Sequence, residues 1–511
     1  MAAARRNAKV IIVGCGIAGI AAAEKLLRFG FADLLIVEAT GRAGGRIHST
    51  NFGKGIFEIG ANWIHGPCME NAVFRVAKNH GLLDQTALLA ENQLVVVEGR
   101  PSLGDSEFRL PGGQQLDEKM IESCEFLYAE ILQRSKAFFR SGEPLPKGIE
   151  SIEGFVKAEL VEALKNEPPE ERAIKLAVMS EKLKLECSIT GSHSMDDVDL
   201  RAFGEYHVLP GLDCTLPRGY QSLTDKMMNM VPLGCIMLNT PVVCIHWQLE
   251  PQKTDGNTRH YSVCVECEGG DKLYADHVLV TIPLGYLKKH HTMLFKPQLP
   301  AEKVRAVQKL GFCTNNKIFM EFEKPFWNPS CKLMELVWPD ESPFKKRNEA
   351  FQAEWQRKMF GIQVLHPPER FGHVLCGWIA GKESEFMETL TESEVRQRML
   401  ELLRSFTGNP NIPAPKRMLI SRWKSHPYTL GSYSYTALGS SGDDIDNLSQ
   451  PLPTGQQRGV QPLQVMFAGE ATHRQFYSTT HGALESGWRE ADRLIKHYST
   501  SNSRHLSNSK L

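Results

Sequence analysis

Apolar residues form their most informative pattern near the start of the chain. Lys9–Val13 is a short apolar run typical of a buried parallel strand, and Leu34–Val37 is a second run of this kind. Ile20–Arg28 lies between them and fits a helix. This order predicts a strand–helix–strand unit in which the two strands are parallel.

Three glycines stand where the first strand meets the helix. Gly14, Gly16 and Gly19 have the spacing G-x-G-x-x-G. Gly14 allows a tight turn, Gly16 lets a pyrophosphate approach the backbone, and Gly19 lets helix and strand pack closely. Glu38 ends the second strand, where a carboxylate can accept hydrogen bonds from an adenosine ribose. These residues predict a dinucleotide site, and this unit alone fits either NAD or FAD.

A basic, glycine-rich turn follows the second strand. Arg42, Gly44, Gly45 and Arg46 form R-x-G-G-R. Two glycines let the chain pass close to a ligand, and two guanidinium groups suit a diphosphate. This turn favours FAD over NAD, and the alternative interpretation is a basic surface turn.

The rest of the chain divides into a helical stretch and a mixed stretch. Residues 67–210 are largely helical by pattern, which is most simply a domain inserted between halves of the nucleotide domain. Residues 241–250, 261–268 and 276–287 read as strands, and Asn315–Trp327 alternates as another. Thr391 opens a capping box, which predicts a helix to about Phe406. Val465–Phe467 reads as a strand and Thr479–His497 as a closing helix.

Several polar residues in these stretches could carry chemistry. His65 lies in a glycine-rich loop, and from the residues alone a structural histidine is the favoured interpretation. Lys317 alternates with apolar residues, and a solvated strand lysine is favoured on the same ground. Glu186 could face solvent or meet a cationic substrate. Glu470 follows a strand and a glycine, where a carboxylate can bind a ribityl or ribose hydroxyl. Thr479 begins a helix whose free N–H groups would stabilise a flavin pyrimidine carbonyl that gains negative charge on reduction.

Composition and charge exclude some classes of protein. The 511 residues include 59 Lys+Arg and 59 Asp+Glu, so the formal net charge is zero, which argues against a nucleic-acid partner. No apolar run reaches the ~20 residues of a membrane helix. The 12 cysteines are too sparse for a disulfide scaffold, and their spacing predicts no metal site.

A secretory signal at the start is rejected, because it would include the glycine turn. Ser509, Lys510 and Leu511 form the peroxisomal S-K-L address, which predicts an import receptor as a partner.

Taken together, these motifs resemble the flavin-containing amine oxidases over nearly the whole chain. The resemblance rests on the glycine turn with Glu38, R-x-G-G-R, GANWIHG, the lysine in NNKIF, and FAGEATH with YSTTHGALESG. WIHG, LEC and SYSY point further to the peroxisomal polyamine oxidases that act on N1-acetylated substrates. The family implies an α/β fold, with a Rossmann-like FAD-binding domain interleaved with an α+β substrate domain of mixed sheet and helices.

The resemblance also implies roles for single residues. It places the catalytic lysine, which holds a water near flavin N5, at Lys317, and an active-site histidine at His65. Substrate-binding positions fall on His65, Glu186, Ser188, Asn315 and Tyr433. Cofactor-binding positions fall on Gly14, Gly16, Ala18, Gly19, Glu38, Arg42, Gly45, Arg46, Asn62, Trp63, Val242, Glu470, Thr479 and Thr480. Ser432 stands where monoamine oxidases carry their flavin-linking cysteine, so we expect FAD to be bound without a covalent link.

The implied reaction is oxidation of N1-acetylspermine or N1-acetylspermidine at the secondary amine. Its products are 3-acetamidopropanal, spermidine or putrescine, and hydrogen peroxide from molecular oxygen. Two alternatives stay open: a spermine oxidase acting on unacetylated spermine, and a non-catalytic flavin-binding or chromatin-associated protein. Peroxide production suits a peroxisomal location, with a cytoplasmic pool left open. Whether His65 acts chemically or only binds substrate is also open.

The expected domain borders follow from the same assignment. Residues 1–80, 211–300 and 426–498 are expected to form the FAD-binding domain. Residues 81–210 and 301–425 are expected to form the substrate domain. Residues 499–511 are expected to be a flexible tail.

Overall fold

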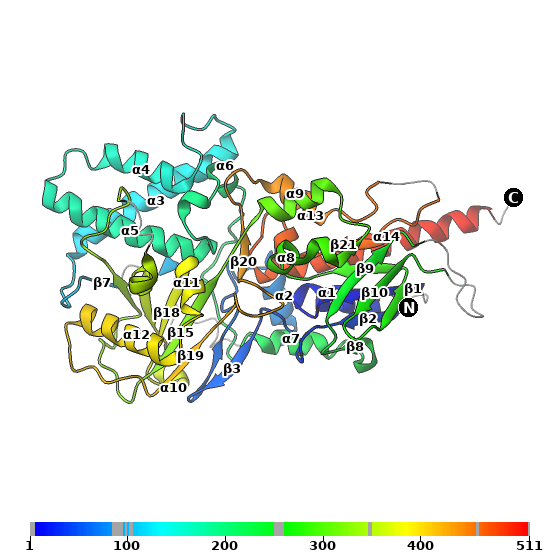
Figure 1. Cartoon of the computed structure of the whole chain (residues 1–511), viewed down its shortest axis with the longest axis horizontal. Coiled ribbons are helices and arrows are strands. Elements are labelled where there is room, and N and C mark those ends of the chain that lie inside the picture. Colours follow the sequence, from blue (N-terminus) through cyan, green and yellow to red (C-terminus); the bar gives the residue numbers. More distant parts are fainter. Residues whose placement is uncertain are drawn as a thin grey trace.

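A parallel sheet forms the centre of one half of the molecule (Figure 1). The computed structural model describes residues 6–83, 96–97, 100–101, 106–249, 260–345, 350–455 and 459–508. In this part of the chain the sheet has the order β21-β12-β1-β2-β8, and every pairing is parallel. Its strands are β1 (Arg6–Val13), β2 (Phe31–Val37), β8 (Ile236–Met237), β12 (His277–Val280) and β21 (Val465–Phe467). The predicted strand–helix–strand unit is confirmed.

Two helices cover one face of this sheet, and a second sheet covers the other. Helix α1 (Ile17–Arg28) packs against the long α14 (Thr480–Asn508), where a Cβ on Gly487 would lie 2.1 Å from the Ala18 carbonyl oxygen. The second sheet has the order β11-β10-β9-β13 and shares an apolar core with the parallel sheet. Its strands are β9 (Val242–Trp247), β10 (Val263–Cys267), β11 (Lys272–Ala275) and β13 (Phe295–Lys296).

The other half of the molecule is built on a mixed sheet of order β19-β15-β18-β17-β16-β7. Its strands are β7 (Ser106–Arg109), β15 (Asn315–Glu321), β16 (Leu333–Leu336), β17 (Gly361–Val364), β18 (Val374–Ala380) and β19 (Arg417–Ile420). Ile318 and Met320 of β15 share a core with α12 (Glu392–Thr407), which has the predicted capping box. Phe319 belongs to the core on the opposite face, with Phe57. The alternation of β15 is therefore confirmed, although every residue in it is buried.

Helices packed beside the mixed sheet form a further apolar core with it. They are α3 (Glu118–Ser141), α4 (Ile152–Ala163), α5 (Pro169–Thr190) and α6 (Leu200–Phe203), and Figure 1 shows them beside one end of the mixed sheet. The remaining elements are β3 (Ser49–Phe52), β4 (Gly55–Glu58), α2 (Ala72–Asn79), β5 (Val96–Val97), β6 (Arg100–Pro101), η3 (Met195–Asp197), α7 (Gln221–Met228), η4 (Leu233–Cys235), α8 (Leu284–Leu294), α9 (Ala301–Lys309), β14 (Gly311–Cys313), η5 (Phe351–Lys358), α10 (Pro368–Phe371), α11 (Lys382–Met387), β20 (Tyr433–Tyr435), α13 (Gly442–Ser449) and η6 (Glu470–Thr472).

Two expectations are corrected. The strand expected over 276–287 ends at Val280, because Pro283 caps α8 and the chain turns there. Residues 499–508, expected as part of a flexible tail, continue α14, since each added residue extends a helix that is already nucleated. Ser509, Lys510 and Leu511, which are expected to form the peroxisomal address, lie outside the described residues. The domain borders given above stay a prediction. Among the described helices, none combines the length and apolar character needed to span a bilayer.

Candidate functional site

One cavity of about 440 Å³ gathers nearly all the candidate residues. It extends from the turn after β1 to the helix α5 and the strands β15 and β20. Of the candidates, only Gly19 does not line it. Those that do are Gly14, Gly16, Ala18, Glu38, Arg42, Gly45, Arg46, Asn62, Trp63, His65, Glu186, Ser188, Val242, Asn315, Lys317, Tyr433, Glu470, Thr479 and Thr480. Residues more than 400 positions apart in the sequence thus face one space.

The glycine turn has the geometry that its spacing predicts. Gly14 has a φ of +108°, which disfavours any other residue, and a Cβ on Gly19 would lie 2.2 Å from the Gly14 carbonyl oxygen. A Cβ on Gly16 would meet nothing within 4 Å, so that position opens onto the cavity. Glu38 is fixed at the end of β2 by hydrogen bonds from the backbone N–H groups of Cys15 and Thr40, each 2.8 Å long. This end of the cavity therefore has room at a backbone turn and a fixed carboxylate beside it.

The two arginines of the basic turn differ in what they contact. Arg42 donates from its two terminal nitrogens to the carbonyl oxygens of Ala43, Gly45 and Ile47, so it shapes its own loop. Arg46 donates to the carbonyl oxygen of Ser432 at 2.8 Å and pairs with Glu470 at 2.9 Å. Arg46 is the better placed of the two to direct charge into the cavity.

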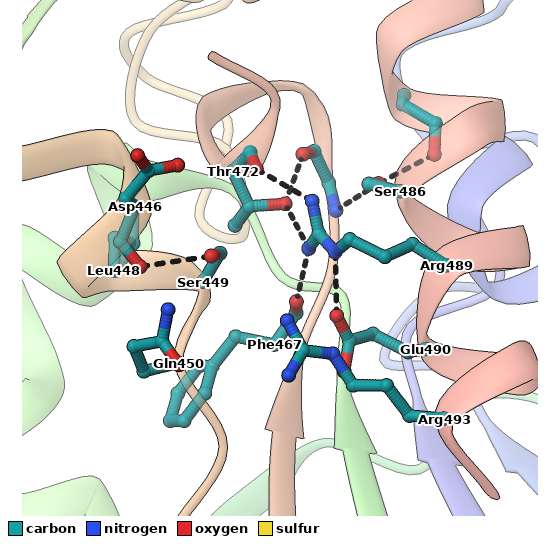
Figure 2. Close-up of polar contacts among 12 residues, drawn as sticks. Asp446, Leu448, Ser449, Gln450, Phe467, Thr472, Ser486, Arg489, Glu490 and Arg493 are labelled. Atoms are coloured by element: carbon teal, nitrogen blue, oxygen red, sulfur yellow. Dashed lines mark hydrogen bonds and ion pairs between the residues drawn. The ribbon is translucent and has the colours of Figure 1, made fainter. Parts of the chain in front are cut away.

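Glu470 lies in a turn that the long helix α14 holds in place, where Figure 2 shows Arg489 beside Phe467 and Thr472. Its Oε2 accepts hydrogen bonds from the hydroxyl of Ser434 at 2.5 Å and the backbone N–H of Ser478 at 2.9 Å. The turn that carries it is bound by Arg489, which donates to the carbonyl oxygens of Phe467 and Thr472 at 3.0 and 2.7 Å. Glu490 has no exposed side-chain surface and pairs with Arg489 at 2.6 Å. Arg489 is therefore an indirect support of the site that the sequence analysis missed.

Lys317 is buried, which makes the interpretation as a solvated strand lysine wrong. Its ammonium donates to the carbonyl oxygens of Glu58 at 2.8 Å and Gly60 at 2.7 Å. It also lies 4.6 Å from the ring centroid of Trp378, its cross-strand partner. Burial lowers the pKa of Lys317 to about 8, although Cys376 and Glu58 oppose the shift. A lysine that titrates near physiological pH at a cavity wall is suited to proton or charge chemistry.

Two tryptophans link Lys317 to His65. Trp63 stacks on Trp378 with ring centroids 5.4 Å apart, and Trp63 lies 6.2 Å from the His65 ring. The indole N–H of Trp63 is buried at the cavity and has no partner among the described residues. These rings give the middle of the cavity an aromatic wall.

His65 forms a pair with a buried aspartate that the sequence analysis did not single out. Its Nδ1 lies 2.7 Å from Oδ2 of Asp213, whose side chain is 1% exposed. Oδ1 of Asp213 accepts the backbone N–H of Gly66 at 3.1 Å. The carboxylate fixes the ring and leaves Nε2 for other contacts, as in the orienting partner of a catalytic histidine. The interpretation of His65 as only a structural histidine is not favoured by this geometry.

The far end of the cavity contains the remaining substrate candidates. Asn315 donates from its amide nitrogen to the Ser188 carbonyl oxygen at 2.9 Å and the Tyr433 hydroxyl oxygen at 2.7 Å. Because the Ser188 oxygen can only accept, this fixes the orientation of the Asn315 amide. Its Oδ1 is then a buried acceptor that receives no hydrogen bond within the described ranges. Glu186, which is 1% exposed, also lines the cavity.

The first turn of α14 forms another wall. The Thr479 hydroxyl caps the helix by accepting the backbone N–H of Gly482 at 3.0 Å. His481 also lines the cavity, and burial, with His65 and His473 nearby, lowers its pKa to about 3. His481 was not predicted, although it stands within the TTHG motif that carried the family resemblance. Ala18, Asn62 and Val242 line the cavity as expected.

Comparisons with known proteins agree with this arrangement. The profile of the family described as "Flavin containing amine oxidoreductase" matches residues 17–495. A "Peroxisomal N(1)-acetyl-spermine/spermidine oxidase" of Bos taurus is 48% identical over 96% of this chain and 95% of its own length. The protein of that name in Homo sapiens is 48% identical over 95% of this chain and 94% of its own. A solved structure of an engineered putrescine oxidase matches with a TM-score of 0.66 at 17% identity, over 96% of this chain and 99% of that one, which shows the α/β fold.

The residues present fit FAD, the cofactor of the family. The open position at Gly16 suits its diphosphate, Glu38 suits its ribose, and the orphaned indole N–H of Trp63 suits a polar partner in the cavity. The fold, the site and the extent of these matches agree, and the chain belongs to the flavin-containing amine oxidoreductases, with FAD as its cofactor.

Proposed function

We propose that this protein oxidises N1-acetylated polyamines at the secondary amine next to the three-carbon acetylated arm. The products are 3-acetamidopropanal, spermidine or putrescine, and hydrogen peroxide. The names of the two mammalian relatives support this substrate class. The observation that carries the proposal is that the glycine turn, Lys317, Glu186 and Asn315 line one cavity.

Bound FAD supplies the redox chemistry: it accepts a hydride from the carbon beside the amine and is reoxidised by oxygen. The chain's own residues bind and orient the amine. Glu186 offers a carboxylate to a distal ammonium, and His65, held by Asp213, offers Nε2 to an amine N–H. The reacting nitrogen must be neutral, and removal from water on entering the cavity lowers the pKa of an amine bound there.

The uncharged acceptor at Asn315 favours an acetylated end over a free ammonium. Oδ1 has no hydrogen-bond partner within the described parts of the chain and can accept one N–H. The N–H of an acetylated amine is satisfied by one neutral acceptor. A free ammonium loses the hydration of a full charge when it is buried, and only a carboxylate partner compensates for that loss. The alternative, a spermine oxidase, would require Glu186 or another acid to take that role.

A peroxide assay that compares N1-acetylspermine with spermine near neutral pH tests the proposal. We expect a clear excess of kcat/KM for N1-acetylspermine. The variant Asn315→Asp should shift the ratio toward spermine, since it places a charge where the ammonium would lie. Preference for spermine in the unaltered enzyme would replace the proposal with the spermine oxidase alternative. A yellow protein that gives no peroxide with either amine would support the non-catalytic alternative.

We also propose a peroxisomal location, because both mammalian relatives carry that word in their names. Import through Ser509, Lys510 and Leu511 is part of this proposal. Fluorescence microscopy of the full chain beside a peroxisomal marker tests it, and a diffuse signal would contradict it.

A further inference from the structure

We infer that Tyr220 is a positioning residue that turns the Thr480 hydroxyl proton into the cavity, toward the pyrimidine end of bound FAD. Tyr220 does not line the cavity and has no exposed surface. It reaches the site only through Thr480, whose Oγ1 lies 2.5 Å from the Tyr220 hydroxyl oxygen. The inference rests on the proposed function, with the pyrimidine end of FAD at the first turn of α14 as the sequence predicts.

The direction of this hydrogen bond follows from burial. If Tyr220 accepted the hydroxyl proton of Thr480, its own proton would be buried with no acceptor recorded in the described part of the chain. An unmade hydrogen bond of this kind is unfavourable, so Tyr220 is the donor. Thr480 Oγ1 then accepts, and its own proton must point elsewhere.

The Thr480 hydroxyl proton points toward the cavity. Thr480 is the first residue of α14 and lines the cavity, and the adjacent Thr479 already occupies the carbonyl oxygen of Phe476 at 2.7 Å. The backbone N–H groups at this helix end point the same way. His481, 2% exposed, adds an orphaned Nε2 in the same turn, for which the structure as described contains no partner. Donors thus converge where the pyrimidine end of FAD gains negative charge on reduction.

Tyr220 is itself fixed to the strand that positions Lys317. Its backbone N–H donates to Oε1 of Glu58 at 2.8 Å, and the carbonyl oxygen of Glu58 accepts the Lys317 ammonium. Ser49 holds the second carboxylate oxygen of Glu58 at 2.7 Å. A single residue of β4 therefore fixes both Lys317 and the backbone from which the Tyr220 phenol extends, which makes the phenol a rigid donor.

The test is the two-electron midpoint potential of bound FAD, measured against a redox dye without amine or oxygen. Without the Tyr220 donor, nothing fixes the rotation of the Thr480 hydroxyl, so its proton spends less time toward the cavity and the reduced state is stabilised less. We expect Tyr220→Phe to lower the potential by about 10–30 mV, a two- to tenfold change in the reduction equilibrium. Thr480→Val should lower it at least as much. Tyr220→Phe should cause no further change in the T480V background.

A control variant separates this effect from general loosening. Tyr498→Phe removes a similar hydroxyl, which lies 2.7 Å from Nε2 of His277, near the other end of α14. We expect it to leave the potential unchanged, and an equal shift would overturn the inference. If Thr480→Val shifts the potential and Tyr220→Phe does not, the inference is wrong while the FAD placement stands. If neither variant shifts it, the placement fails and the inference with it.

A second measurement keeps the inference testable if Tyr220→Phe alone binds no FAD. Thr480→Val leaves the Tyr220 hydroxyl buried without an acceptor, whereas Thr480→Ser keeps one. The thermal midpoint should therefore fall more in T480V than in T480S, and adding Tyr220→Phe to T480V should recover part of the loss. Equal midpoints for the Val and Ser variants would overturn the proposed hydrogen bond.

Discussion

Lys317 offers the sharpest test of how this cavity works, because burial lowers its pKa to about 8. At that pKa the ammonium form outweighs the neutral amine about tenfold at pH 7, and the ratio is reversed at pH 9. A buried positive charge stabilises the negative charge that develops as oxygen is reduced. We therefore expect reoxidation of the reduced enzyme to slow up to about tenfold between pH 7 and pH 9. Lys317→Met should be slower than the unaltered enzyme at pH 7 by about tenfold or more and should lose this pH dependence.

The assay mixes anaerobically reduced enzyme with oxygenated buffer in a stopped-flow instrument and follows the visible flavin absorbance. No amine is present, so titration of the substrate does not contribute. Lys288→Met is a matched control, because burial also lowers the pKa of Lys288 to about 8, yet this lysine donates to the Gln308 carbonyl oxygen outside the cavity. The reasoning is refuted if Lys317→Met reoxidises at the unaltered rate or keeps the inflection near pH 8.

Two further variants test the supports of the site. Asp213→Asn removes the charge that orients His65, so kcat/KM for N1-acetylspermine should fall about tenfold or more. Glu266→Gln is the control: it alters the solvent-accessible pair of Glu266 with His246, and kcat/KM should change little. An unchanged kcat/KM for Asp213→Asn would show that His65 needs no orienting partner. Arg489→Ala frees the turn that carries Glu470, which we propose binds the cofactor, so FAD should dissociate more readily in an ultrafiltration assay. Arg493→Ala serves as the control, because Arg493 pairs with Glu490. Equal FAD retention in both variants would contradict this role of Arg489.

The cofactor half could be predicted from the sequence because its signals are local. Gly14, Gly16 and Gly19 mark one turn, which follows the apolar end of β1 and leads into α1. The R-x-G-G-R turn was located correctly, but the separate tasks of its two arginines were not, since Arg42 contacts carbonyl oxygens of its own loop that no side-chain pattern records. Motifs therefore identified residues that line the cavity, while the individual hydrogen bonds depended on backbone geometry.

The chemistry at the centre of the cavity depends on contacts between distant segments, which a linear pattern cannot show. The alternation of β15 correctly separated Lys317 from Ile318, but it could not tell that the carbonyl oxygens of Glu58 and Gly60 cover Lys317. Asp213 lies 148 positions from His65 and had no motif to mark it. A strand pattern predicts which face of the sheet a side chain lies on. Whether a lysine on that face is hydrated, or is buried with its pKa lowered to about 8 as in Lys317, depends on which other segments pack there. The reactivity proposed here therefore arises where segments from both halves of the molecule meet.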